Sequence, residues 1–147
     1  MARLYAPYVQ ERNEQNLLLF AFMPPDVETF ICVGRTDLRK GIDGLAGIVE
    51  DYYDLNPYAK AIYCFCGSSF DRIKMICFDG KAFIQMVYRM EKGTTFQWPK
   101  PEEPENSKTF GDMWLIDRIG FCNELLEGKP LNEEVHRHRV FKKRATV

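Results

Sequence analysis

Two adjacent cations, Arg39 and Lys40, follow residues that commonly begin a helix. Thr36 is a typical N-cap residue, and Asp37 is acidic, as first-turn residues often are. The sequence therefore predicts a helix from about Asp37 to Tyr53 with both cations in its first turn. The amino end of a helix already carries partial positive charge, so cations there are unfavourable unless an anion neutralises them. Free backbone N–H groups beside two cations predict an anion site, and phosphate is the common biological anion.

A second group of cations is predicted on one face of a β-hairpin within residues 71–90. Asp79-Gly80 is a strong two-residue turn signal between two runs with strand character. With a two-residue loop, Phe78 lies opposite Lys81, and residues opposite each other share a face. One face of the hairpin is then uncharged. The other face carries three cations and no acid: Arg72, Lys74 and Arg89.

The C-terminal residues 132–147 form a third basic group, with five basic and two acidic residues. Three of the cations are consecutive: Lys142, Lys143 and Arg144. This segment predicts a basic tail that has no fixed structure of its own. Because the formal net charge of the whole chain is −1, any contact with nucleic acid must come from such local groups.

Gly41, Gly44 and Gly47 recur at three-residue intervals inside the predicted helix. Each glycine costs a helix interior about 1 kcal/mol relative to alanine. Their spacing indicates a surface that another backbone approaches closely. We favour packing against the protein's own sheet, and a groove for a ligand or a partner is the alternative.

Other site chemistry is not indicated. The five cysteines are expected to be reduced and buried, because Cys64-x-Cys66 lacks a second pair at zinc spacing and both histidines lie near the C-terminus. Neither a nucleophilic triad nor a phosphate-binding loop pattern is visible. We therefore expect no catalytic residue, no metal and no cofactor. We also expect a cytoplasmic protein without membrane association, since the longest apolar run, Leu17–Met23, is too short to span a bilayer.

The elements predict a single α+β domain. An antiparallel meander from about Ala61 to Trp98 is expected to pack its uncharged face on the helix over residues 37–53, with a strand over Val27–Val33 before it and a second helix over Gly111–Glu127 after it. Phe96 and Trp98 are expected in the core, on a strand that starts at Thr94 after a three-residue turn with Gly93 left-handed. A two-residue turn would place both on the basic face instead. The predicted division has three parts: an N-terminal extension at 1–26, the domain at 27–128 with an acidic linker at 99–107, and the basic tail at 129–147.

Several blocks of the chain resemble, in order, the TnpB accessory proteins of insertion sequence 66 type bacterial transposons. The resemblance covers roughly residues 27–128. The blocks are Gly34–Leu45, Asp71–Lys74, Phe78–Gly80, Tyr88–Gly93, Phe96–Pro99 and the end of the second predicted helix at Leu125–Gly128. That family is encoded beside a separate transposase and is needed for efficient transposition. The resemblance implies an accessory factor and assigns no catalytic residue.

Three functional hypotheses follow. The first is a non-catalytic module that binds transposon DNA through the cations above, although the same cations could instead pair with nearby carboxylates on a solvated surface. The second is an adaptor that contacts the transposase or another accessory protein through the glycine surface and the second helix. The third is a metal-dependent nuclease. Its candidate ligands are Asp37, Asp43, Asp71, Asp79 and Glu91.

Overall fold

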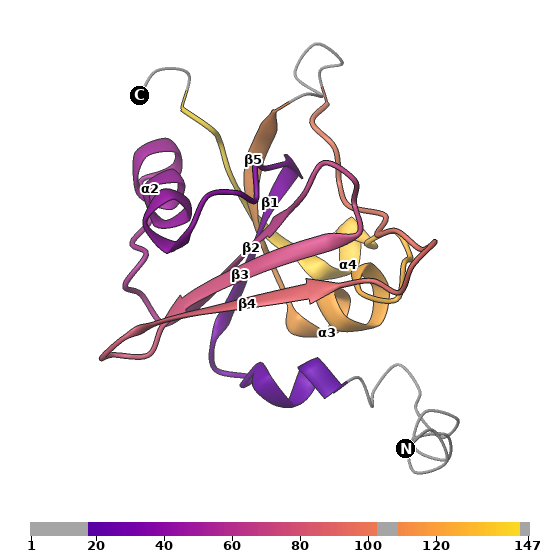
Figure 1. Cartoon of the computed structure of the whole chain (residues 1–147), viewed down its shortest axis with the longest axis horizontal. Coiled ribbons are helices and arrows are strands. Elements are labelled where there is room, and N and C mark those ends of the chain that lie inside the picture. Colours follow the sequence, from indigo (N-terminus) through magenta and orange to yellow (C-terminus); the bar gives the residue numbers. More distant parts are fainter. Residues whose placement is uncertain (1–17, 103–108, 145–147) are drawn as a thin grey trace.

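A six-stranded mixed β-sheet forms the centre of the computed structural model, which describes residues 18–102 and 109–144 (Figure 1). The strand order is β4-β3-β2-β1-β5-β6. The strands are β1 (Glu28–Arg35), β2 (Ala61–Cys66), β3 (Arg72–Phe78), β4 (Phe83–Arg89), β5 (Phe110–Ile116) and β6 (Arg137–Phe141). The helical segments are η2 (Leu18–Phe22), α2 (Ile42–Tyr53), α3 (Arg118–Gly120), η4 (Phe121–Leu125) and α4 (Glu133–His136). The predicted α+β class is confirmed.

The strands β1 and β2 pair in parallel and are joined by α2, whereas the other neighbouring strands pair antiparallel. All residues of β2 are buried, as is typical of a strand in the middle of a sheet. A parallel pair needs a crossover, and the crossover helix covers one face of the sheet. The opposite face must then be covered by another part of the chain.

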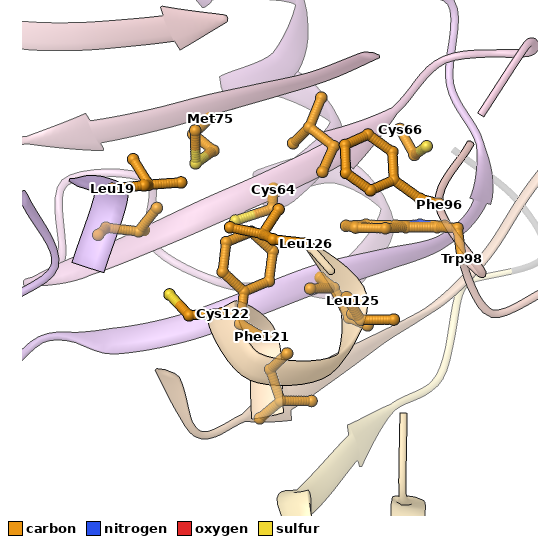
Figure 2. Packing of buried hydrophobic residues seen from close by; sticks show 14 of the residues in the cluster. Leu19, Cys64, Cys66, Met75, Phe96, Trp98, Phe121, Cys122, Leu125 and Leu126 are labelled. Atoms are coloured by element: carbon orange, nitrogen blue, oxygen red, sulfur yellow. The ribbon is translucent and has the colours of Figure 1, made fainter. Parts of the chain in front are cut away.

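Helices cover both faces of the sheet, with α2 on one side and α3 and α4 on the other (Figure 1). On the α2 side, Leu45 and Val49 pack with Phe65 and Ile76. The predicted packing of the uncharged hairpin face on α2 is therefore wrong. That face, which includes Ile73 and Met75, packs with residues of η4 and with Phe96 and Trp98 (Figure 2). Alternation showed which residues share a face, but it could not show which helix covers that face.

The β3–β4 hairpin has a longer turn than the sequence predicted. Phe78 lies opposite Phe83 rather than Lys81, so residues 79–82 form the loop. Asp79 Oδ1 holds this loop by accepting hydrogen bonds from the backbone N–H groups of Lys81 and Ala82, at 2.9 and 2.8 Å. The register differs from the prediction by two residues. Because side chains alternate with a period of two, the predicted faces are preserved.

The C-terminal part differs most from the prediction. Residues 111–116 of the second predicted helix belong instead to β5, and the chain becomes helical only at Arg118. Asp117 caps this helix by accepting a hydrogen bond from the N–H of Gly120 at 2.7 Å. The expectation that the basic tail lacks fixed structure is also wrong, because it contains α4 and β6. Ring nitrogens of His136 and His138 lie 3.0 and 3.1 Å from Asp117 Oδ2 and fix the start of β6 there.

Two other expectations have mixed outcomes. Phe96 and Trp98 lie in the core as predicted, although residues 94–98 form no strand. Residues 1–17 of the predicted N-terminal extension and residues 103–107 of the predicted linker lie outside the described residues. In the part of the chain that the structure describes, no helix has the length and apolar character that a bilayer crossing requires.

Candidate functional site

A pocket of about 740 Å³ lies at the end of the sheet where β1 and β2 finish. It is lined by the loop after β1, the turn after β2 and the start of β3. These segments lie together because the ends of β1 and β2 are paired with each other and the end of β2 is paired with the start of β3. The carboxyl end of a parallel βαβ unit is a common place for ligands in sheets with crossover helices. The lining residues are Arg35, Thr36, Asp37, Leu38, Arg39, Gly67, Ser68, Ser69, Asp71, Arg72, Lys74 and Val87.

The loop after β1 is longer than predicted, because α2 begins at Ile42 with Gly41 as its N-cap. The predicted N-cap, Thr36, is 4% exposed, and its backbone N–H donates to the carbonyl of Cys66 in β2 at 2.8 Å. Its hydroxyl lies 4.0 Å from the Cys32 thiol instead of capping a helix. Arg39 and Lys40 therefore precede the helix, and the prediction that they occupy its first turn is wrong.

Arg39 forms an ion pair with Asp37 inside this loop. The Arg39 Nη2 and Asp37 Oδ2 atoms are 2.8 Å apart, and Arg39 Nε donates to Oδ1 at 2.9 Å. Hydrogen bonds from the guanidinium and from the backbone N–H of Arg39 lower the pKa of Asp37 to about 2. The charge of Arg39 is thus partly neutralised by its own loop, and an incoming anion would have to compete with this carboxylate.

Lys74 joins the hairpin to the same loop, since its Nζ donates to the backbone carbonyl of Lys40 at 3.1 Å. The next cation on this face, Arg72, lies directly opposite Arg89 across the β3–β4 ladder, and both side chains are exposed. Within the described residues, neither guanidinium forms an ion pair with a carboxylate. Like charges directly opposite each other destabilise a sheet. An anion bound between Arg72 and Arg89 would reduce this repulsion. We call Arg72, Lys74 and Arg89 the cationic strip.

The pocket as a whole is positive, because four cations and two carboxylates line it and one of the carboxylates is paired with Arg39. The structure brings three of the predicted phosphate-binding candidates into it: Arg39, Arg72 and Lys74. Sequence reasoning missed Arg35, Ser68 and Ser69. Arg35 is the last residue of β1 and both serines follow β2, so an inference of parallel pairing across α2 could have found them.

The C-terminal cations lie at the same end of the sheet, because β5 begins and β6 ends beside the end of β1. Lys142 Nζ is 3.3 Å from Asp112 Oδ2. The Lys143 Nζ donates to the carbonyl of Phe110 at 3.1 Å and lies 4.3 Å from the centroid of that ring. The backbone N–H of Arg144 donates to the carbonyl of Tyr52 at 2.9 Å. These contacts dock the chain end on β5 and α2, and the three residues line a second pocket of about 720 Å³.

The helix glycines do not pack against the sheet, so that prediction is wrong. A Cβ atom added at Gly41 would meet nothing within 4 Å, and one at Gly44 would meet only the Lys40 side chain, at 3.1 Å. At Gly47 the nearest atom would be Asp51 Oδ2, at 4.0 Å. The glycines lie on the side of α2 that faces away from the core.

The carboxylates considered for nuclease chemistry are dispersed. Asp37 pairs with Arg39, and Asp79 holds the hairpin loop. Among the residues that the structure describes, no group of three or more acidic, histidine or cysteine side chains is placed to hold a metal ion.

The geometry thus defines a small α+β protein with a positively charged pocket at one end of a mixed sheet. Residues 27–116 match the family described as IS66 Orf2 like protein, and this match spans more than half of the chain. The protein therefore belongs to that family of insertion-sequence accessory proteins. This confirms the resemblance seen in the sequence blocks.

A relative in Sinorhizobium fredii (strain NBRC 101917 / NGR234), named only as the uncharacterized protein y4hO, is 34% identical over 77 residues. The aligned region covers 52% of this chain and 66% of the relative. No solved structure matches this chain.

Proposed function

We propose that this accessory protein assists transposition by binding the phosphates of transposon DNA through the cationic strip. The observation that carries the proposal is the Arg72–Arg89 cross-strand pair, in which two exposed guanidiniums oppose each other without a carboxylate among the described residues. Phosphate contacts position a protein on DNA and supply most of its non-specific affinity.

The neighbouring groups support the same proposal. Lys74 donates a hydrogen bond to the backbone carbonyl of Lys40, which holds the loop after β1 beside the cationic strip. The exposed hydroxyls of Ser68 and Ser69 line the same pocket and can donate to phosphate oxygens. Arg39 contributes less because it is paired with Asp37. At the second pocket Lys142 pairs with Asp112, and the Lys143 Nζ donates to the carbonyl of Phe110.

The cognate transposase is the proposed protein partner, and the bacterial cytoplasm is the proposed compartment. The family match supports the first, because accessory proteins act with the rest of the transposition machinery. The five unpaired cysteines support the second, since disulfides are rare in reducing compartments.

The double variant Arg72→Ala/Lys74→Ala should bind duplex DNA of the transposon end at least about tenfold more weakly at moderate salt. Removing two phosphate contacts should also reduce the slope of log affinity against log salt by about two. Fluorescence anisotropy over a salt series measures both quantities, with and without the transposase. The charge-matched control is Lys60→Ala/Lys92→Ala, which removes two exposed lysines outside the pocket. An equal loss of affinity in both double variants would show that only net charge matters.

The exposed glycine side of α2 supports a second candidate function, an adaptor that docks the transposase there. Gly47→Ala should raise the free energy of unfolding by about 0.5–1 kcal/mol. The added methyl group meets only one atom, at van der Waals distance, and alanine lowers the conformational entropy of the unfolded chain. Denaturant unfolding measures this change. The same stabilised variant then tests the adaptor in DNA-free co-purification with the transposase. Unchanged recovery of the transposase with Gly47→Ala and with the bulkier Gly47→Gln would count against docking at this surface.

A further inference from the structure

The two edges of the sheet differ in chemistry. β6 contains Arg137, His138 and Arg139, and charged side chains of this kind discourage pairing with another chain. β4 has no charged residue from Ile84 to Tyr88, no proline and no bulge in its ladder with β3. Ile84 and Val87 are 42% and 55% exposed. Among the described residues, no strand pairs with the outer side of β4.

The outward-facing backbone groups of β4 can be assigned from the ladder. The N–H of Met90 donates to the carbonyl of Asp71, and the carbonyl of Ala82 accepts from Asp79, so both residues point toward β3. Backbone direction alternates along a strand in an antiparallel pair. The odd-numbered residues Phe83, Gln85, Val87 and Arg89 therefore direct their N–H and carbonyl groups outward. This pattern is what a further antiparallel strand requires.

We infer that the β4 edge pairs with the β4 edge of a second copy of this chain, antiparallel and centred on Met86. In this register Phe83 lies opposite Arg89 of the other copy, and Gln85 lies opposite Val87. Just beyond the two ends of β4, the exposed residues Lys81 of one copy and Glu91 of the other then come close together with opposite charges. A shift by two residues in one direction places Lys81 opposite Arg89 of the other copy, and like charges opposite each other are unfavourable. Charge complementarity therefore favours the Met86 register over that one.

The pairing also places a cation beside aromatic rings. Phe83 belongs to a cluster with Tyr58 and Phe78, whose ring centroids lie 5.0–5.1 Å apart. In the dimer, Arg89 of one copy lies over this cluster of the other, where a cation–π contact is favourable. The twofold axis of such a pair is perpendicular to the sheet, so the cationic strips of both copies face the same side. The dimer itself does not depend on DNA binding.

Charge reversal tests the register on the full chain without DNA. Lys81→Glu and Glu91→Lys should each raise the dimer dissociation constant by about tenfold, because each creates two like-charge contacts per dimer. The double variant Lys81→Glu/Glu91→Lys should restore the wild-type value. Within one chain the whole of β4, about 20 Å long, separates these residues, so the rescue can only act between copies. Sedimentation velocity over a concentration series up to several hundred micromolar measures the association.

Gln85→Pro provides an independent test, because it removes an outward N–H and leaves the β3 ladder intact. Circular dichroism should show a retained fold, while the dimer is lost. The inference is overturned by a wild-type protein that stays monomeric over the whole series, by a double variant as weak as the single ones, or by a Gln85→Pro variant that dimerises normally. None of these outcomes depends on the proposed DNA binding.

Discussion

Replacing Trp98 by alanine should lower the free energy of unfolding by about 3–5 kcal/mol. Trp98 is 3% exposed, and the centroid of its ring lies 6.4 Å from those of Phe96 and Phe121 (Figure 2). Its indole N–H donates to the carbonyl of Cys32 in β1 at 2.8 Å. Truncation removes the packing and also leaves a buried carbonyl without its donor. Denaturant unfolding followed by circular dichroism measures the loss.

Two further variants separate these contributions. Trp98→Phe keeps an aromatic ring and loses the hydrogen bond, so its cost should be smaller, about 1–3 kcal/mol. Gln97→Ala changes an exposed neighbour and should stay within about 0.5 kcal/mol of the wild type. A cost below about 1 kcal/mol for Trp98→Ala would contradict the assignment of Trp98 to the core.

The core position of Trp98 was predictable because it depends on local chain geometry. Gly93 has a left-handed backbone, with φ +92, as the expected three-residue turn requires. The two faces of the hairpin were predictable for a related reason. Side chains alternate between the two faces of a strand, so a register error of two residues leaves each side chain on its predicted face. The residues of the cationic strip therefore share a face as predicted, although the predicted hairpin loop is wrong.

The C-terminal part was not predictable from local pattern. Leu115, Ile119, Cys122 and Leu126 recur at helical spacing, so residues 111–127 read as one amphipathic helix. The chain instead adds Phe110–Ile116 to the sheet between β6 and β1, and β1 lies far away in the sequence. Strand formation there depends on long-range partners, and such tertiary pairing overrides a short periodic pattern.

The candidate site was predicted in composition but not in geometry. Thr36 has the right residue type for a helix cap, but its backbone N–H is hydrogen-bonded to β2. Thr36 is therefore buried, and the helix begins only at Ile42. The anion site argued from a basic first turn is therefore replaced by a pocket between the loop after β1 and the start of β3. The parallel pairing of β1 and β2 places the two groups of cations together, and no single segment of sequence contains that information.

The position of the pocket loop depends on Gly34, and Gly34→Ala should lower the free energy of unfolding by more than about 2 kcal/mol. Gly34 has φ +83 and lies where the pairing of β1 with both neighbours shifts register. Its N–H donates to the carbonyl of Pro99 at 2.7 Å. An added Cβ would lie 2.7 Å from the backbone oxygen of Thr109, which cannot move without displacing the start of β5.

Gly80→Ala is the matched control for this change. Gly80 also has a left-handed backbone, with φ +98, but a Cβ there would meet nothing within 4 Å. Its cost should be only the conformational strain, about 1–2 kcal/mol. The difference between their free energies of unfolding in urea then measures the energetic effect of the close contact between Gly34 and the backbone of Thr109. Because Gly34 directs the chain into Arg35 and Thr36, a folded Gly34→Ala protein should also bind DNA more weakly than Gly80→Ala. An equal loss of unfolding free energy in the two variants would mean that the chain at Thr109 can shift easily. Gly34 would then not fix the position of the pocket loop.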